Sequence, residues 1–241
     1  RFFAEGARSL RTSNGPGDVN GDGIDDLVLG EGYANTGVFV IYGKQGGWGL
    51  GDIELNSYVN GQTGFVWEVS DGSSHILQTA WGDWNGDGFA DITNGSYTYD
   101  SGGFTNNGIF GTFNGGDFTG SISHQGTEGN DMLNGTGLAD VIVGGQGDDH
   151  LCGHGGQDAL NGGSGDDVLV VHDSTFIKAE GGGGFDTLLW AGAGMDLDLL
   201  TLPTDVISGI EAIDMTGAGN NSLSLNVQDV LNISSTTDTL I

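Results

Sequence analysis

Two different patterns of hydrophobic residues divide the chain. In residues 1–124, short runs alternate apolar and polar positions, as is typical of half-buried β-strands. The runs that predict strands, about four to each unit, are 26–32, 37–43, 64–69, 75–82, 91–99, 108–113 and 118–123. From Gly126 onward, the apolar residues instead recur at every ninth position. Both patterns predict β-structure, and the chain as a whole is therefore expected to be all-β.

The nine-residue pattern is a repeat of the form G-G-x-G-x-D-x-U-x, where U is a large apolar residue. Six units fit it, at 126–134, 135–143, 144–152, 153–161, 162–170 and, after an irregular segment at 171–180, at 181–189. The sixth position is always aspartate: Asp131, Asp140, Asp149, Asp158, Asp167 and Asp186. The eighth position is always leucine or isoleucine: Leu133, Ile142, Leu151, Leu160, Leu169 and Leu188. Such regularity predicts stacked, equivalent structural units.

Each unit has six turn residues and three strand residues, so two units make one coil of a right-handed parallel β-roll. The eighth-position side chains then point into a narrow core. Stacked coils lie about 4.8 Å apart, which brings the aspartates of alternate units close together. Because neighbouring carboxylates repel one another, this stack needs a cation between its turns.

The composition supports that need. The chain has 33 acidic and 5 basic residues among 241, with a net charge of -28. This charge argues against nucleic acid and against anionic membranes as partners, and no apolar run reaches the roughly 18 residues of a membrane span. A hydrophobic content of 36% allows a core, and a single cysteine excludes an internal disulfide framework. Bound metal is then the expected crosslink.

A second acidic motif occurs twice, as GDVNGDGIDD at 17–26 and GDWNGDGFAD at 82–91. When positions are counted from the first aspartate of each copy, side-chain oxygen donors stand at positions 1, 3, 5 and 9. Position 7 offers a backbone carbonyl. The predicted ligands are Asp18, Asn20, Asp22, Ile24 and Asp26 in the first copy and Asp83, Asn85, Asp87, Phe89 and Asp91 in the second. Hard oxygen donors around a glycine turn predict Ca²⁺, whereas Zn²⁺ prefers Cys or His. Position 12 is Leu29 or Asn94 rather than the glutamate of an EF-hand.

The first motif, with the strands around it, resembles the FG-GAP repeats of integrin-α-type β-propellers, and this resemblance implies a calcium loop in each blade. Closure of a propeller takes about four blades. Either further blades precede residue 1, which is Arg rather than Met, or the two units pack as a small pair of sheets. The first arrangement is the one we expect.

The nonapeptides resemble the RTX, or hemolysin-type, calcium-binding repeats, and this resemblance implies several Ca²⁺ ions along the roll. The runs DLDLLTL, VISGIEAIDM, NSLSLNVQDVLNIS and DTLI in 190–241 are expected to be strands that cap or continue the roll. The segment resembles those that follow RTX repeats in large bacterial surface proteins. The expected domains are residues 1–124, two FG-GAP-like units; 125–189, the β-roll; and 190–241, the cap.

Catalytic motifs such as H-E-x-x-H and G-x-S-x-G are absent, so we expect no enzymatic activity. The expected function is that of a calcium-dependent structural or adhesion segment of a large RTX surface protein that is exported by type I secretion. We therefore expect it outside the cell or on a bacterial surface, beside further domains of a longer chain. One alternative is the non-catalytic, calcium-binding portion of a secreted RTX hydrolase.

A third alternative is a glycan-binding module. Trp81 and Trp84 flank the second loop, where an indole beside calcium would stack on a sugar, or where both would belong to the core. A cell-surface glycan or protein is the expected ligand class. We assign no ligand role to His150, His154 or Cys152, which stand at variable positions of the repeat.

Overall fold

The computed structural model describes residues 2–3, 10–12, 17–31, 37–49, 51–68, 76–96, 109–194, 196–203, 206–216 and 219–234. The described chain is an all-β protein with two short helices. It forms two compact units, each described here by itself. The first comprises Arg1–Asn20, Ile24–Trp84 and Phe89–Gly120, and the second comprises Gly21–Gly23, Asn85–Gly88 and Ser121–Ile241.

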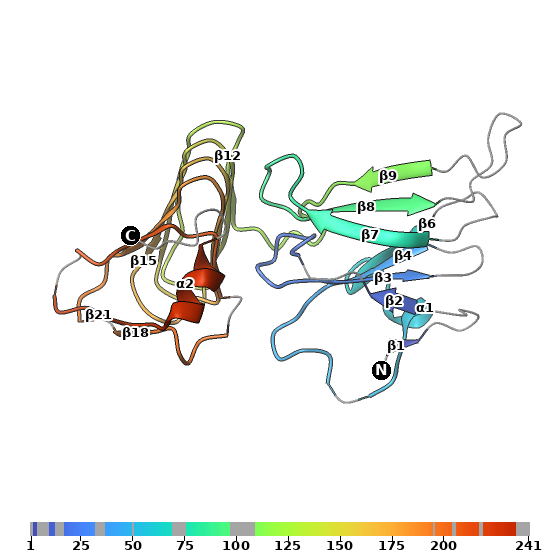
Figure 1. The fold of residues 1–241 in the computed structure, drawn as a ribbon, viewed down its shortest axis with the longest axis horizontal. Helices are drawn as coiled ribbons and strands as arrows, with labels where there is room; N and C mark the ends of the chain where they lie inside the picture. The colour runs from blue at the N-terminus through green and yellow to red at the C-terminus, as the bar shows by residue number, and fades with distance from the viewer. Residues whose placement is uncertain are drawn as a thin grey trace, which may run out of the picture. The chain divides into compact units, whose positions relative to one another are not determined.

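The first unit contains two antiparallel, blade-like sheets (Figure 1). One has the order β2 (Leu10–Thr12), β3 (Leu27–Glu31), β4 (Gly37–Ile41) and β6 (Gly64–Glu68). The other has β7 (Ile76–Gly82), β8 (Asp91–Ser96) and β9 (Ile109–Phe113). A parallel pair, β1 (Phe2–Phe3) and β5 (Ile53–Glu54), precedes the helix α1 (Leu55–Tyr58). The strands expected in this part of the chain are confirmed, except at 118–123.

Strand alternation explains the two cores of this unit. Val28, Val38 and Val40 face a cluster with Ile92 of the second sheet. Leu29, Phe39 and Ile41, on the opposite faces of the same strands, pack with Leu55 of α1. Because β3 and β4 are covered on both sides, their sequences are nearly continuous apolar runs.

The second unit is a parallel β-roll of two five-stranded sheets, in which successive coils lie side by side (Figure 1). One sheet has β10 (His124–Gln125), β12 (Val141–Gln146), β14 (Ala159–Ser164), β16 (Lys178–Gly183) and β19 (Ile207–Ser208). The other has β11 (Met132–Asn134), β13 (His150–His154), β15 (Val168–Val171), β17 (Thr187–Trp190) and β20 (Ala212–Asp214). The register places Ile142 beside Leu160 and Leu151 beside Leu169, so one coil is two repeats.

The eighth-position side chains form the core of the roll, as the pattern predicts. Ile142, Leu151, Leu160, Leu169 and Leu188 are fully buried in one cluster, and Leu133 of the first repeat is packed against it. The irregular segment at 171–180 completes a coil, and its Phe176 packs edge-on against Trp190 in the same cluster. The roll therefore tolerates one degenerate repeat because the core position is still filled.

Beyond the nonapeptides, β19 and β20 continue both sheets of the roll, which confirms the strands expected in 206–215. A further parallel pair, β18 (Asp196–Asp198) and β21 (Ser222–Ser224), lies in the cap. The strand expected after residue 226 is wrong: Val227–Ile233 is the helix α2. Its cause is a capping box, in which the Asn226 side chain accepts from the amides of Gln228 and Asp229. Apolar content alone did not reveal this signal.

The strand expected at 118–123 is also wrong. The segment turns at Gly120, whose φ is 70°, and the Gly120 amide donates to Asp117 Oδ1 at 2.6 Å. The glycine and the aspartate favour a turn over pairing. The expected strand at DTLI, 238–241, lies outside the described residues, as do positions 32, 69, 75, 97–99 and 108 of the expected strands.

The cap helix offers a test of how the roll ends. The Ile233 carbonyl accepts from the Ile210 amide at 3.0 Å, so α2 is bound to the last coil. Asn226→Ala is expected to lower the free energy of unfolding by about 1 kcal/mol, measured by denaturant titration in saturating Ca²⁺. Val227→Ala, at a position that is 78% exposed, serves as the control and should change little. Equal stability of the two variants would contradict a role for the cap.

Candidate calcium sites

The repeat aspartates stand in two rows, one on each side of the roll. The first row holds Asp131, Asp149, Asp167 and Asp186, each directly before a strand of the sheet from β11 to β20. The second holds Asp140 and Asp158, each directly before a strand of the sheet from β10 to β19. Aspartates of alternate repeats are thus brought together, as the sequence predicts.

A ladder of hydrogen bonds links the first row from coil to coil. The Asp131 amide donates to Asp149 Oδ1 at 2.7 Å, and the Asp149 amide donates to Asp167 Oδ1 at 2.7 Å. The Asp167 amide continues the ladder to Asp186 Oδ1 at 2.8 Å. In the second row, the Asp140 amide donates to Asp158 Oδ1 at 3.0 Å. One oxygen of each acceptor carboxylate therefore accepts a hydrogen bond from the preceding coil.

The other oxygen distinguishes the opening repeats from the later ones. In the first two repeats, Thr127 and Thr136 each donate an amide and a hydroxyl to Oδ2 of Asp131 and Asp140. In the later repeats of the first row, the residue corresponding to threonine is glycine. Asp149 Oδ2, Asp167 Oδ2 and Asp186 Oδ2 are buried with no hydrogen-bond partner. Three buried anionic oxygens without a partner need an explanation.

Glycine is required around these oxygens because there is no room for a side chain. A Cβ on Gly144 would lie 2.4 Å from Asp149 Oδ2, and one on Gly162 would lie 2.2 Å from Asp167 Oδ2. Gly163, with φ of 101°, would place a Cβ 2.0 Å from the carbonyl oxygen of Gly145 in the preceding coil. The turns therefore bring main-chain oxygens and carboxylates into close stacks.

The electrostatics of the first row reflect this crowding. Burial, together with the neighbouring carboxylates, raises the pKa of Asp167 and of Asp186 to about 7. Burial also raises the pKa of Asp149. At Asp140, burial acts in the same direction, but hydrogen bonds from Thr136 outweigh it and the pKa is lowered. Burial likewise raises the pKa of Asp158 in the second row. The buried carboxylates without threonine donors are thus the ones that resist ionisation.

These features fit Ca²⁺. The ion takes six to eight hard oxygen ligands from carboxylates and backbone carbonyls, and the row offers both kinds. Asp149, Asp167 and Asp186 would hold it through the oxygens that lack partners. Bound Ca²⁺ supplies positive charge between coils, which keeps the carboxylates ionised.

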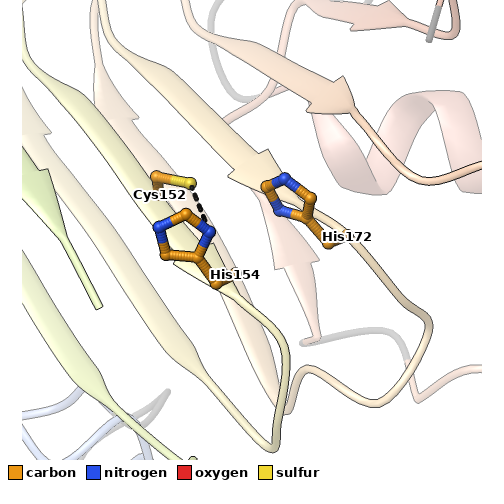
Figure 2. A group of neighbouring side chains, drawn as sticks. All are labelled: Cys152, His154 and His172. Carbon is orange, nitrogen blue, oxygen red and sulfur yellow. Dashed lines mark hydrogen bonds between the residues drawn. The ribbon is translucent and has the colours of Figure 1, made fainter. Parts of the chain in front are cut away.

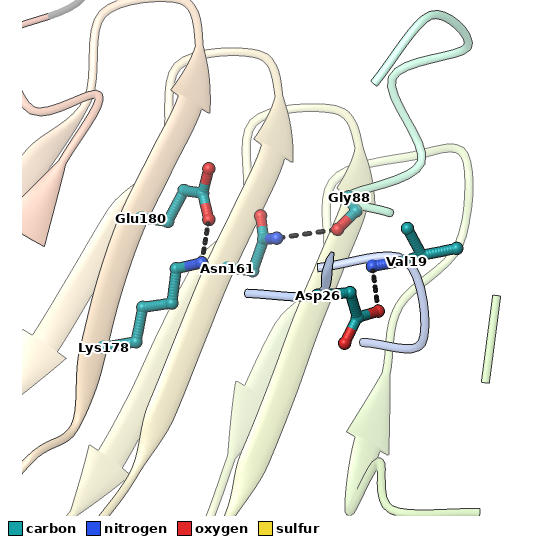
Figure 3. Close-up of polar contacts among 6 residues, drawn as sticks. All are labelled: Val19, Asp26, Gly88, Asn161, Lys178 and Glu180. Atoms are coloured by element: carbon teal, nitrogen blue, oxygen red, sulfur yellow. Dashed lines mark hydrogen bonds and ion pairs between the residues drawn. The ribbon is translucent and has the colours of Figure 1, made fainter. Parts of the chain in front are cut away.

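The second row is shorter. After Asp158 its next turn has Ile177, whose amide donates to the Asp158 carbonyl at 2.8 Å. Just beyond, Lys178 Nζ lies 3.0 Å from Glu180 Oε2 in an ion pair on β16 (Figure 3). The row thus ends in a lysine and an apolar residue instead of a third aspartate. We expect it to contribute less calcium binding than the first.

Three ladder residues were missed by the sequence analysis. Glu211 is 1% exposed, and its Oε2 accepts from the Asp186 amide at 2.9 Å. It therefore ends the first row at the place where the next aspartate of that row would stand. Asp148 Oδ1 accepts from the Asp166 amide at 3.0 Å, and Asp166 Oδ1 accepts from the Phe185 amide at 2.8 Å. The doubled aspartates of GDD at 147–149 and 165–167 were the available signal.

In the loops of the amino-terminal half, Asp26 and Asp91 have corresponding structural roles. Asp26 Oδ2 accepts from the Val19 amide at 3.0 Å (Figure 3), and its Oδ1 accepts from the Gly43 amide at 2.7 Å. Asp91 accepts from the amides of Trp84 and Gly115, each at 3.0 Å. Position 9 of each motif therefore joins the loop to the end of a later strand, which spacing alone did not predict.

The remaining predicted loop ligands differ in exposure. Asp18 and Asn20 are buried, Asp22 and Ile24 are half-buried, and Phe89 is buried. Asp83 and Asn85 are exposed, and Asn85 Nδ2 donates to the half-buried Asp87 at 2.7 Å. Gly21, Gly23, Gly86 and Gly88 all have positive φ, which confirms a tight glycine turn in both copies. Calcium ligation by these loops stays a prediction.

The raised pKa values predict an unusual pH dependence for the metal-free roll. Unfolded aspartate titrates near pH 4, whereas Asp167 and Asp186 titrate near 7 in the folded roll. Folding without calcium therefore takes up protons, so acidification from pH 7.5 to 5 should stabilise the roll. With saturating Ca²⁺, which competes with protons, the same acidification should destabilise it. The β-sheet signal of the roll in circular dichroism, followed in urea titrations where the roll is folded, gives the comparison at both pH values with EDTA and with Ca²⁺. The same sign under both conditions would contradict the assignment.

Comparison with known families agrees with this geometry. Residues 125–160 and 134–169 match the family described as RTX calcium-binding nonapeptide repeat (4 copies). Residues 11–46 match the FG-GAP repeat. No curated protein matches the chain. The chain therefore carries calcium-binding RTX repeats in a parallel β-roll and an FG-GAP repeat in a propeller-type unit.

Proposed function

We propose that this chain is a calcium-dependent structural and adhesion segment of a large extracellular protein, and that it has no catalytic role. The observation that carries the proposal is the first row, where three buried carboxylate oxygens have no partner. A unit built in this way is expected to be unstable until a divalent cation arrives. Its folding is then governed by the calcium concentration around it.

That dependence suits export. Metal binding contributes directly to folding where the site does not exist in the unfolded chain. If calcium is scarce inside the cell and abundant outside, the chain stays unfolded for type I secretion and folds after release. RTX repeats are typical of secreted proteins, and no described helix is long and apolar enough to cross a membrane. The repeats support a location outside the cell or on its surface.

The FG-GAP repeat supports the adhesive part of the proposal. Strands β3 and β4 are covered on both faces, so the loops rather than the sheet surfaces remain to contact a partner. We propose a cell-surface protein or glycan as that partner. Neighbouring domains of a longer polypeptide would supply further blades.

Calcium removal is the direct test of the proposal. With EDTA at pH 7.5, the β-sheet signal of the roll in circular dichroism should be lost, and Ca²⁺ should restore it. Mg²⁺ should restore it poorly, because it requires octahedral geometry and retains its waters. A β-sheet signal from the roll that survives chelation would refute the proposal.

Asp149→Asn and Asp131→Asn form a matched pair for the same titration. Asp149 has an unpartnered oxygen, whereas both Thr127 donors satisfy the corresponding oxygen of Asp131. Asp149→Asn removes a calcium ligand while Asp167 and Asp186 keep their charge, so it should lose bound calcium and raise the calcium midpoint of folding several-fold. Asp131→Asn should shift that midpoint less. Calorimetry counts the ions in each variant. A larger loss from Asp131→Asn would contradict the assignment.

A second candidate function is glycan binding, and the exposure of Trp84 favours it. This indole is 59% exposed beside the second loop, so it is not a core residue; the side chain of Trp81 lies outside the described residues. Trp84→Ala should leave the melting temperature within about 1 °C, since it opens no cavity. If Trp84 stacks on a sugar, the variant should lose glycan-array binding that the wild type shows with calcium. Binding that persists in Trp84→Ala would exclude this role.

The other alternative is the non-catalytic portion of a secreted RTX hydrolase. This alternative has the same calcium chemistry as the proposed adhesion segment. The two differ only in the other domains of the polypeptide. A catalytic domain in the remainder of the precursor would favour the hydrolase, whereas further blades or tandem adhesive domains would favour the proposal.

A further inference from the structure

The second row of the roll brings together a cysteine and two histidines that the calcium scheme does not use. Cys152 and His154 lie on β13, and His172 directly follows β15. Their candidate ligand atoms all lie within 4.8 Å of one another. Figure 2 shows the three side chains gathered on neighbouring strands of the roll. No other group of this kind involves a thiol among the described residues, since Cys152 is the chain's one cysteine.

The coil geometry explains the meeting. His154 is the second residue of the repeat 153–161, and His172 is the second residue of the degenerate segment 171–180. They stand 18 residues apart, and their ring centroids lie 5.2 Å apart with the ring planes tilted by 32°. A register shift after Cys152 pairs His154 with Val171, the residue before His172. Cys152 Sγ lies 3.8 Å from His154 Nδ1. An 18-residue spacing of histidines in a roll was the sequence signal for this group.

The backbone at His154 is the second observation. Its φ is 67°, the one positive φ of a non-glycine residue in the described chain. The corresponding residues Gly145, Gly163 and Gly182 of other repeats are glycines with φ near 100°. A side chain in this region costs stability that glycine would avoid. Thr127, Thr136 and His172 also occupy this position, but His154 alone among the four has a positive φ. This local strain points to a use for the imidazole.

The chemistry of the group is that of a transition-metal site. One thiolate with two imidazoles is a donor set for Zn²⁺ and related ions, and Ca²⁺ disfavours it. The two histidines are exposed and Cys152 is buried, so an ion from solvent would reach the thiol between the rings. The charges of Asp158 and Asp173 act on the two histidines, which favours a cation.

We infer that Cys152, His154 and His172 form a binding site for a thiophilic transition-metal ion of the Zn²⁺ class, separate from the calcium sites, with solvent completing the coordination. The ion would crosslink two successive coils where the second row lacks a third aspartate. It would thus take the place of calcium at that point of the roll.

Cobalt tests the site in the full-length chain, folded in saturating Ca²⁺. Co²⁺ added to this protein should give a thiolate-to-metal absorption band in the near ultraviolet that saturates at one ion per chain, and Zn²⁺ should displace it. Zn²⁺ should also protect Cys152 from a thiol reagent. Absence of the band, or a thiol that reacts equally with and without Zn²⁺, would overturn the inference.

His154→Gly is the sharpest variant because glycine stands at the corresponding position in three repeats of the first row, at Gly145, Gly163 and Gly182. It should keep or raise the melting temperature in calcium while weakening Co²⁺ and Zn²⁺ binding at least about tenfold, since it removes one of three protein ligands. Cys152→Ala should abolish the thiolate band. His150→Ala, on the same strand but outside the group, is the matched control and should bind Zn²⁺ normally. Unchanged Zn²⁺ affinity in His154→Gly or His172→Ala would show that the group is no metal site.

Discussion

A stack of buried carboxylates is the constraint on which the roll depends. Each coil must place its aspartate next to the aspartate of the preceding coil, because its carboxylate accepts a hydrogen bond from the amide of that earlier aspartate. The hydrogen bonds stabilise the stacking, but they satisfy only one oxygen of each side chain. The second oxygen of Asp149, Asp167 and Asp186 stays buried and unpartnered. Bound calcium would resolve the conflict by converting like-charge repulsion into coordination.

The same constraint explains the composition of the repeats. Glycine is required beside the carboxylates because a Cβ would collide with them. Leucine or isoleucine fills the narrow core, to which each repeat contributes one large side chain. Thr127 and Thr136 stand where the rows begin and donate to their own aspartates. The opening repeats therefore share the nine-residue pattern of the later repeats, but they need bound metal less than the later repeats do. A repeat count alone would overestimate the number of sites.

Periodicity made the roll, its core and the two rows predictable, because a nine-residue period has one structural solution that buries the eighth position. Local chemistry was harder to read. The helix α2 depends on a capping box at Asn226 and Asp229 that competes with an apolar pattern compatible with a strand. Glu211 escaped prediction because it is a glutamate outside the period, and only the three-dimensional stack places it under Asp186. Asp26 and Asp91 were expected as metal ligands, and their amide hydrogen bonds to later strands depend on contacts distant in sequence.

The central claim is that charge on the unpartnered carboxylates, rather than lack of core, keeps the roll from folding without calcium. Circular dichroism of the triple variant Asp149→Asn, Asp167→Asn, Asp186→Asn at pH 7.5 with EDTA tests it most directly. The carboxamides keep the shape and the Oδ1 acceptors while removing the charge. The roll of this variant is expected to show its β-sheet signal without calcium and to gain little when calcium is added. A variant that stays unfolded in EDTA and still folds on addition of Ca²⁺ would contradict it.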